Sequence, residues 1–220
     1  MQECLKTRIR ILYSLCETEG DKFVSEWQTA EQIVVPMLFS IGWGYSECSS
    51  HGISLIRTGS TKDFDLLFLN LTTRIVYMGV ECKRMKTSLS AKKKIKTKKS
   101  PSNDSFSEQI IRYKEKSNII SSEAENSRFS FDSSAKFVWA NGVEWIVFKD
   151  AAFARTAEQK QDISDLFAKG NGSLSNGLSY DDYFMRFSFL KDNENAWDTQ
   201  FENLSRELAP EWGHDNATRR

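Results

Sequence analysis

Apolar residues recur at helical spacing in the first forty residues of the chain. Residues 4–17 place Leu5, Ile9, Leu12 and Leu15/Cys16 on one face, which predicts an amphipathic helix. A second helical pattern runs from about Glu26 to Ser40 and stops at the two glycines of Ile-Gly-Trp-Gly, residues 41–44. The chain therefore begins with two helices.

The next part of the chain has the pattern of strands. Residues 52–57, 64–69 and 75–82 are short and apolar, and Leu66-Leu67-Phe68-Leu69 is unbroken, as in a strand buried on both faces. Residues 136–140 and 144–149 are two further strands joined by Asn141-Gly142, a strong hairpin signal. Between them we predict a polar loop over 86–108, a helix from about Ser107 to Asn118, and a second loop over 121–135.

After Asp150 the pattern is helical again. Residues 156–168 form one predicted helix, and a Gly/Ser/Asn break at 170–177 follows. Ser179-x-x-Asp182 resembles a helix cap before Phe184 and Phe187, and a last helix carries its apolar stripe from Trp197 to Leu208. We therefore expect an α/β core over residues 1–150, with a mostly helical extension over 151–220 packed on it.

Composition and charge narrow the class of protein. The 220 residues are 40% hydrophobic and 27% charged, which suits a folded domain. Lys plus Arg equals Asp plus Glu at 30 each, so any affinity for a polyanion must come from a local patch. The four cysteines are scattered and only two histidines occur, which disfavours a disulfide framework or a histidine-based metal site. With no long apolar run, we expect a cytoplasmic protein that does not contact a membrane.

The first candidate for chemistry is Glu81-Cys82-Lys83, at the end of an apolar strand. Strand residues two apart share a face, so Glu81 and Lys83 project together while Cys82 faces the core. If the preceding strand pairs with this one antiparallel, Asp65 at its start lies beside Glu81. Asp63 has the same parity and is the alternative. Two converging carboxylates favour a divalent cation, and the lysine can position or activate water.

These residues resemble the core of the PD-(D/E)XK nucleases, and more narrowly the nuclease domain at the N-terminus of type I restriction enzyme R subunits. Glu31, on the helix before Ile-Gly-Trp, matches the family's acidic helix residue near the metal. Gln109 to Tyr113 matches its Gln-x-x-x-Tyr motif, and residues 137–145 resemble its closing strand pair. The proline of the Pro-Asp signature is Phe64 here, and no phosphate-loop motif of a translocating motor occurs.

The resemblance, which covers about residues 25–150, implies a restriction-endonuclease-like fold: a mixed central sheet flanked by helices. It implies a Mg²⁺- or Mn²⁺-dependent endonuclease acting on DNA in restriction, defence or phage DNA processing. Asp65 and Glu81 would bind the metal with help from Glu31, Lys83 would activate water, and Gln109 would orient the substrate. Cleavage of RNA, or a catalytically silent binding scaffold of the same fold, are the alternatives.

Two regions have a possible role in binding. The lysine-rich segment that follows the Glu81 strand is either a solvated loop or a phosphate contact, and Tyr113 is a further nucleic-acid candidate. The lysines are Lys92, Lys93, Lys94, Lys96, Lys98 and Lys99. The C-terminal extension is the expected place for a homodimer or partner contact. By contrast, Trp139, Trp145, Phe137 and Phe148 are expected in the core, and His51 in a solvated loop.

Overall fold

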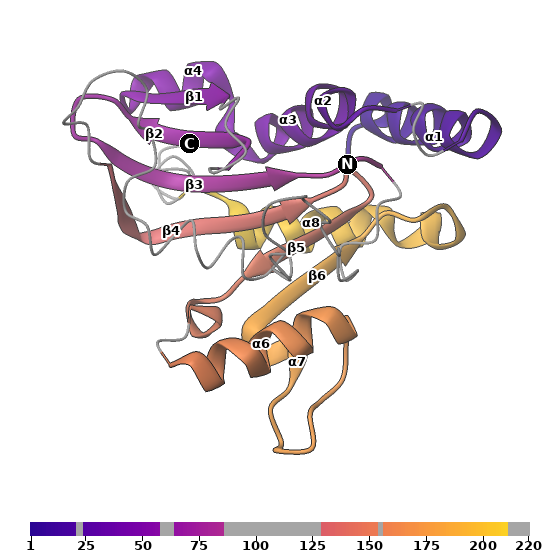
Figure 1. Cartoon of the computed structure of the whole chain (residues 1–220). Coiled ribbons are helices and arrows are strands. Elements are labelled where there is room, and N and C mark those ends of the chain that lie inside the picture. The colour runs from indigo at the N-terminus through magenta and orange to yellow at the C-terminus, as the bar shows by residue number, and fades with distance from the viewer. Residues whose placement is uncertain (21–23, 58–63, 86–128, 154–155, 211–220) are drawn as a thin grey trace, which may run out of the picture.

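A computed structural model describes residues 1–20, 24–57, 64–85, 129–153 and 156–210 of the chain. Six strands in this part of the chain form one sheet in the order β1-β2-β3-β4-β5-β6 (Figure 1). They are β1 (Ile53–Arg57), β2 (Leu66–Asn70), β3 (Ile75–Cys82), β4 (Ser130–Ala140), β5 (Glu144–Phe148) and β6 (Phe184–Ser188). Neighbouring strands are antiparallel except for β3 and β4, which are parallel. The sheet is therefore mixed and open, and the protein is of the α/β class.

The two helices predicted at the start of the chain are confirmed, whereas the helix predicted from about Ser107 to Asn118 and the loop over 86–108 lie outside the described residues. α1 (Glu3–Thr18) precedes a continuous helical run made of α2 (Glu26–Thr29), η1 (Ala30–Val34), α3 (Val35–Leu38) and η2 (Phe39–Trp43). η1 and η2 are π-helical turns on either side of Pro36, whose nitrogen cannot donate a helical hydrogen bond. Gly42, where φ is 114°, departs from helical geometry next to the end of the run at Trp43, as the glycines predict. α4 (Tyr45–Ser50) then leads into β1.

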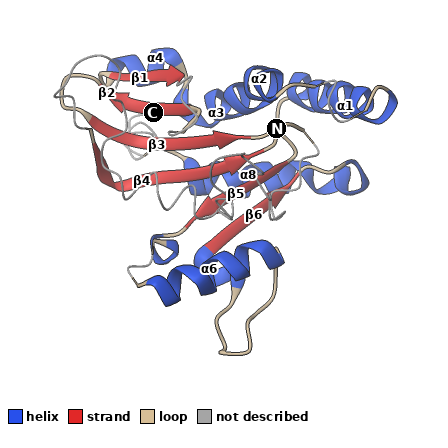
Figure 2. Ribbon diagram, in the orientation of Figure 1, coloured by secondary structure: helices blue, strands red, loops and turns tan. Residues whose placement is uncertain are grey.

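Helices cover both faces of the sheet (Figure 2). One face packs against α1, the helical run 26–43 and α8 (Trp197–Leu208), through Ile9, Ile33 and Leu204 among others. The other face packs against α6 (Ala157–Lys169), through Ile163, Leu166 and Phe167. The predicted core aromatics, Phe137, Trp139, Trp145 and Phe148, are all buried. No described helix is long and apolar enough to cross a membrane.

The predicted loop over 121–135 is wrong at its C-terminal end, because β4 already begins at Ser130. Ser130 and Phe131 pair with Ile75 and Val76, and the register then jumps so that Met78 pairs with Lys136. The polar residues between form a bulge, in which Asp132 Oδ1 accepts a hydrogen bond from Ser134 N at 2.9 Å. Residues 132–135 are therefore part of a bulged strand and not of a free loop.

The helix expected after Ser179 is also wrong beyond Tyr183. α7 (Tyr180–Tyr183) is a single turn, and residues 184–188 form β6, which pairs along its whole length with β5. Phe184 and Phe187 are three apart, a spacing that suits one face of a helix but the opposite faces of a strand. They indeed belong to different core clusters. The extension after residue 150 therefore includes the last strand of the sheet, besides η3 (Asp150–Ala152), α6, α7, η4 (Lys191–Ala196) and α8.

Candidate active site

Asp65 and the Glu81 segment meet at one end of the sheet. β2 and β3 pair antiparallel with Leu66 opposite Val80, so Asp65 at the start of β2 lies beside the end of β3. The backbone amide of Cys82 donates a hydrogen bond to Asp65 Oδ2 at 2.7 Å. The expected antiparallel pairing is therefore confirmed, and it brings the two acidic positions together.

Lys83 completes this cluster. Its Nζ lies 2.6 Å from Glu81 Oε1 and 5.2 Å from the centroid of the Trp139 ring. Its backbone amide donates to Ala140 O at 2.8 Å, so the pairing of β3 with β4 extends to Lys83 itself. The lysine and the carboxylate thus share one side of the strand end, whereas Cys82 is buried in the core cluster of Val80 and Met78, as predicted.

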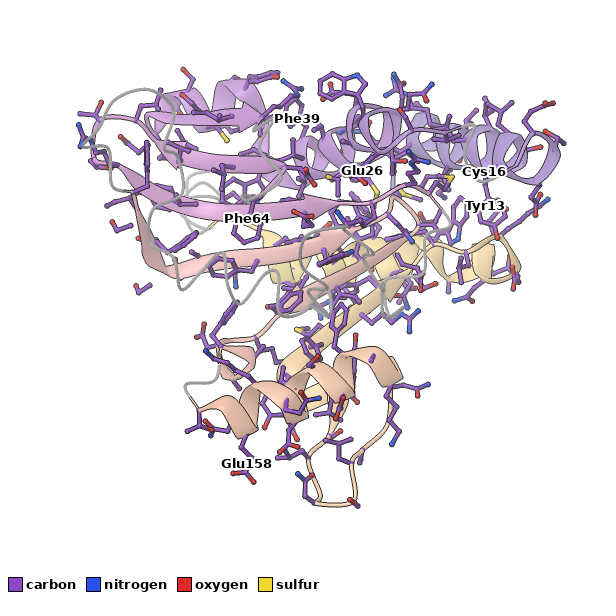
Figure 3. The ribbon with its side chains drawn as sticks, in the orientation of Figure 1. Tyr13, Cys16, Glu26, Phe39, Phe64 and Glu158 are labelled. Carbon is purple, nitrogen blue, oxygen red and sulfur yellow. The ribbon has the colours of Figure 1, made fainter. Side chains whose placement is uncertain are left out.

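A third acidic residue, Glu26, reaches the same ammonium group. Its Oε1 lies 3.8 Å from Lys83 Nζ. Glu26 is the first residue of α2. Ser25 is the N-cap of this helix and forms a capping box with Gln28. Figure 3 shows Glu26 where the helical run passes the end of β3. The cap predicts where this helix begins, but the resemblance implies Glu31, and not Glu26, as the acidic helix residue of the site.

Burial sets the electrostatics of the cluster. Glu81 is only 2% exposed, and burial raises its pKa to about 8, opposed by the charge of Lys83 and aided by that of Asp65. Burial likewise raises the pKa of Asp65 to about 6, opposed by Lys83 and the Cys82 amide. Burial lowers the pKa of Lys83, but the charges of Glu81 and Glu26 outweigh it and leave that pKa raised. Lys83 therefore stays protonated, and Asp65 and Glu81 beside it lose their protons only at a higher pH than ordinary carboxyl groups.

Glu31 does not share a hydrogen bond or ion pair with this cluster among the contacts of the described residues. It lies in η1, and both of its carboxylate oxygens accept from Arg57, at 2.6 Å from Nε and 2.9 Å from the second guanidinium nitrogen. Arg57 is the last residue of β1 and stands opposite Leu66, next to Asp65. The structure thus places Glu31 at the same end of the sheet but bound to an arginine.

Several predicted residues lie outside the described part of the chain. These are Asp63, Gln109, Tyr113 and the lysines 92–99. Their roles stay predictions, and so does the choice between Asp63 and Asp65. Asp65 has the contacts of a site residue, as given above. His51 is exposed, as expected, with its Nδ1 2.9 Å from Glu47 O.

The donor set suits a hard divalent cation. Within the described ranges no group of three or more His, Cys, Asp and Glu side chains is arranged to hold a metal ion. Mg²⁺, however, often uses one or two carboxylates and keeps several waters. Two carboxyl groups with raised pKa values would both gain from a nearby dication. Asp65 and Glu81 are therefore the residues that could hold such an ion, and Glu26 is a further acid that reaches the same lysine.

We compared the chain with protein-family models, with curated proteins and with solved structures, and found no match in any of the three.

Proposed function

We propose that this protein is a metal-dependent nuclease that hydrolyses phosphodiester bonds, with DNA as its substrate. The observation that carries the proposal is the 2.6 Å contact between Lys83 Nζ and Glu81 Oε1, at a strand end where Cys82 N also holds Asp65. A buried ion pair alone would be weak evidence, since such pairs are also structural. Two carboxyl groups and a lysine converging on one point form a more specific arrangement.

The topology supports the same proposal. β1, β2 and β3 form an antiparallel meander, β4 returns parallel to β3, and helices cover both faces. The PD-(D/E)XK resemblance implies a mixed sheet of this kind, with the first acid on the strand before Glu-x-Lys. Restriction, defence or phage DNA processing is the context that this resemblance suggests. It rests on family analogy and not on the site.

The chain's own residues would divide the work as follows. Asp65 and Glu81 would hold the cation, and Glu26 would share in neutralising it and in orienting Lys83. The Lys83 ammonium would hold the attacking water in place and donate to the phosphate oxygens, as charge develops on them. Trp139 and the strand pairing to Ala140 keep this lysine in a fixed position. Lys83 therefore acts as an electrostatic and positioning group.

A divalent cation, when bound, would supply Lewis acidity for the scissile phosphate and the leaving oxygen. It would also favour the ionised forms of Asp65 and Glu81, whose pKa values are raised to about 6 and about 8. Activity should therefore need both the metal and a pH at which these groups give up their protons.

Incubation of purified protein with supercoiled plasmid, linear DNA and RNA tests this proposal, with Mg²⁺, with Mn²⁺ and with a chelator. We expect metal-dependent cleavage of DNA by the wild type and none by Glu81→Gln or Lys83→Ala. Glu17→Gln and Lys191→Ala are matched controls, because Glu17 in α1 and Lys191 in η4 form an exposed ion pair at 3.6 Å. Cleavage of RNA alone would identify an RNA nuclease. Cleavage that survives Glu81→Gln and Lys83→Ala, or no cleavage of any substrate, would contradict the proposed site.

A further inference from the structure

Trp27 is a large aromatic side chain exposed beside the candidate active site. It is 61% exposed, whereas Trp43, Trp139, Trp145 and Trp197 are buried. It directly follows Glu26, whose carboxylate lies 3.8 Å from Lys83 Nζ. Burying an indole is strongly favourable, so one left open at this place calls for an explanation.

The indole is held in place and not simply left in solvent. The Arg57 guanidinium lies 5.6 Å from the centroid of the Trp27 ring. Glu31 in turn holds Arg57 through two hydrogen bonds, at 2.6 and 2.9 Å. These bonds raise the pKa of Arg57, so the cation under the ring is permanent. Glu31, Arg57 and Trp27 thus form a chain of contacts that presents an aromatic surface.

A groove of about 530 Å³ lies next to these three residues, and Arg57 and Glu31 form part of its walls. It runs between the N-terminal part of α1 and the helical run 26–43, and its other walls include Arg8, Phe39 and Tyr45. Tyr45 is a second exposed aromatic, at 57%. Arg8 is exposed and forms no ion pair with the residues that the structure describes. The groove therefore adds a second exposed aromatic, Tyr45, and a cation, Arg8, to the surface that Trp27 begins.

We propose that Trp27 stacks against an unpaired nucleobase next to the scissile phosphate, and that the groove towards Arg8 guides the neighbouring nucleotides. The substrate would then be single-stranded or locally unpaired nucleic acid. This inference rests on the proposed nuclease function, and it names the substrate class for that site. Glu31 gains a role in it as a positioning residue that acts through Arg57.

An unpaired strand fits these features better than an intact duplex. In a duplex the faces of the bases are already stacked, so an exposed indole can reach one only if the base is unpaired. Stacking on aromatic side chains is also a sequence-tolerant source of affinity, because every base has an aromatic face. That suits a chain with 30 basic and 30 acidic residues, which has no overall field for a polyanion.

Binding without cleavage tests the proposal. Fluorescence anisotropy in a chelator would compare labelled oligothymidylate, oligouridylate and a duplex of the same length. We expect the wild type to prefer the single strands, and Trp27→Ala to weaken their binding by about fivefold or more. Trp27→Phe should keep most of the affinity, because it keeps an aromatic face. Leu71→Ala is the matched control, since Leu71 is 53% exposed but lies just after β2, at the other end from Asp65.

The salt dependence separates the two parts of the surface. Arg8→Ala should reduce the slope of log affinity against log salt by about 0.7 for each phosphate of a single strand that Arg8 neutralises in the wild type. Trp27→Ala should leave that slope unchanged. Glu31→Gln should weaken binding less than Trp27→Ala, because the glutamine oxygen can still accept a hydrogen bond from Arg57.

The failure of this inference is distinguishable from that of the nuclease proposal. A wild type that prefers duplex, or a Trp27→Ala protein that binds single strands as tightly as the wild type, overturns the stacking role even if Glu81-dependent cleavage is observed. If single-strand binding depends on Trp27 but no substrate is cleaved with Mg²⁺ or Mn²⁺, the stacking surface stands and the nuclease proposal fails. Equal affinities for oligothymidylate and oligouridylate support stacking, which every base allows. Binding confined to oligothymidylate would also support stacking, on a DNA substrate, provided that Trp27→Ala weakens it, whereas single-strand binding that does not change in Trp27→Ala overturns it.

Discussion

The backbone amide of Cys82 donates a hydrogen bond of 2.7 Å to the carboxylate of Asp65. One strand of the site thus holds the acidic side chain of the other, next to Glu81 and Lys83. Because a one-residue slip of β2 against β3 would turn Asp65 to the opposite face, the site depends on the register of this strand pair. The contacts that set the register of β2 against β3 therefore also set the position of Asp65 relative to Glu81 and Lys83.

Gly79 in β3 leaves room for the side chain that precedes Asp65. A Cβ atom at this position would lie 2.8 Å from the ring of Phe64, the residue before Asp65. We predict that Gly79→Ala lowers the free energy of unfolding by about 1–3 kcal/mol through overpacking. Denaturant unfolding measures this loss. The double variant Gly79→Ala/Phe64→Leu should recover part of the stability. Recovery of nothing would show that the contact is not what limits this position.

Lys83 should matter for stability as well as for activity. Replacing it with Met removes the cation 2.6 Å from the buried Glu81 carboxylate, and breaking a buried pair on one side is costly. We predict a loss of about 3 kcal/mol at pH 8 in urea unfolding. The double variant Glu81→Gln/Lys83→Met should be more stable than Lys83→Met alone, because no charge is then left in the interior. If the two variants unfold alike, Glu81 and Lys83 are not energetically coupled.

The raised pKa values predict how stability depends on pH. Glu81 has a folded pKa of about 8, above its ordinary value near 4.5, so the folded state binds the extra proton between these limits. Stability of the metal-free protein should therefore fall as pH rises from about 5 to 8. A tenfold difference in proton affinity between the folded and unfolded states corresponds to about 1.4 kcal/mol. Glu81→Gln should show less of this fall, and thermal unfolding of both proteins in chelator measures the difference.

The same linkage makes a prediction for the metal. Mg²⁺ should raise the wild-type melting temperature more at pH 8 than at pH 5, because protons compete for the two carboxyl groups at low pH. Glu81→Gln should respond much less at either pH. A melting temperature that rises equally in both proteins would indicate a metal effect elsewhere on the chain.

Asn141 is predicted to support the site from the neighbouring hairpin. Its Oδ1 accepts from the backbone amides of Val143 at 3.1 Å and Glu144 at 2.7 Å, and Gly142 takes a φ of +86°. Asn141→Ala should leave these buried donors without their acceptor and lower the free energy of unfolding by about 1–3 kcal/mol. Asn141→Ser, which keeps an oxygen acceptor without adding a charge beside Glu144, should lose less. Equal losses would mean that the turn does not depend on the side-chain oxygen.

Much of the fold was predictable because local signals and packing agree. The apolar run after Asp65, the Asn141-Gly142 turn and the stripe from Trp197 to Leu208 each have one compatible structure, and the structure has it. The misassigned stretches carry ambiguous spacing. Phe184 and Phe187 satisfy a helix and a strand equally, and only pairing with β5 decides between them. Residues 132–134 are polar and predict a loop, because a bulge has no signal of its own in the sequence.

For the site, strand parity predicted that Glu81 and Lys83 share a face, and this was confirmed. Glu26 and Trp27 were missed. Both stand in the first turn of the helical run, where an acidic or aromatic residue is usually read as a solvated surface. Their proximity to Lys83 and Arg57 comes from the packing of α2 against the strand ends, which no local pattern encodes. The same packing brings Glu31 to Arg57.

The cleavage rate of single-stranded DNA in Mg²⁺, under single-turnover conditions, decides whether Glu81 belongs to a nuclease active site. The proteins to compare are the wild type, Glu81→Gln and the surface control Glu17→Gln, each checked for its melting temperature. We predict cleavage by the wild type and by Glu17→Gln at the same rate, and a loss of at least about a hundredfold in Glu81→Gln, the scale for one electrostatic group of an active site. Equal rates for Glu81→Gln and the wild type, or no cleavage by a folded wild type with Mg²⁺ or Mn²⁺, would contradict the proposed function.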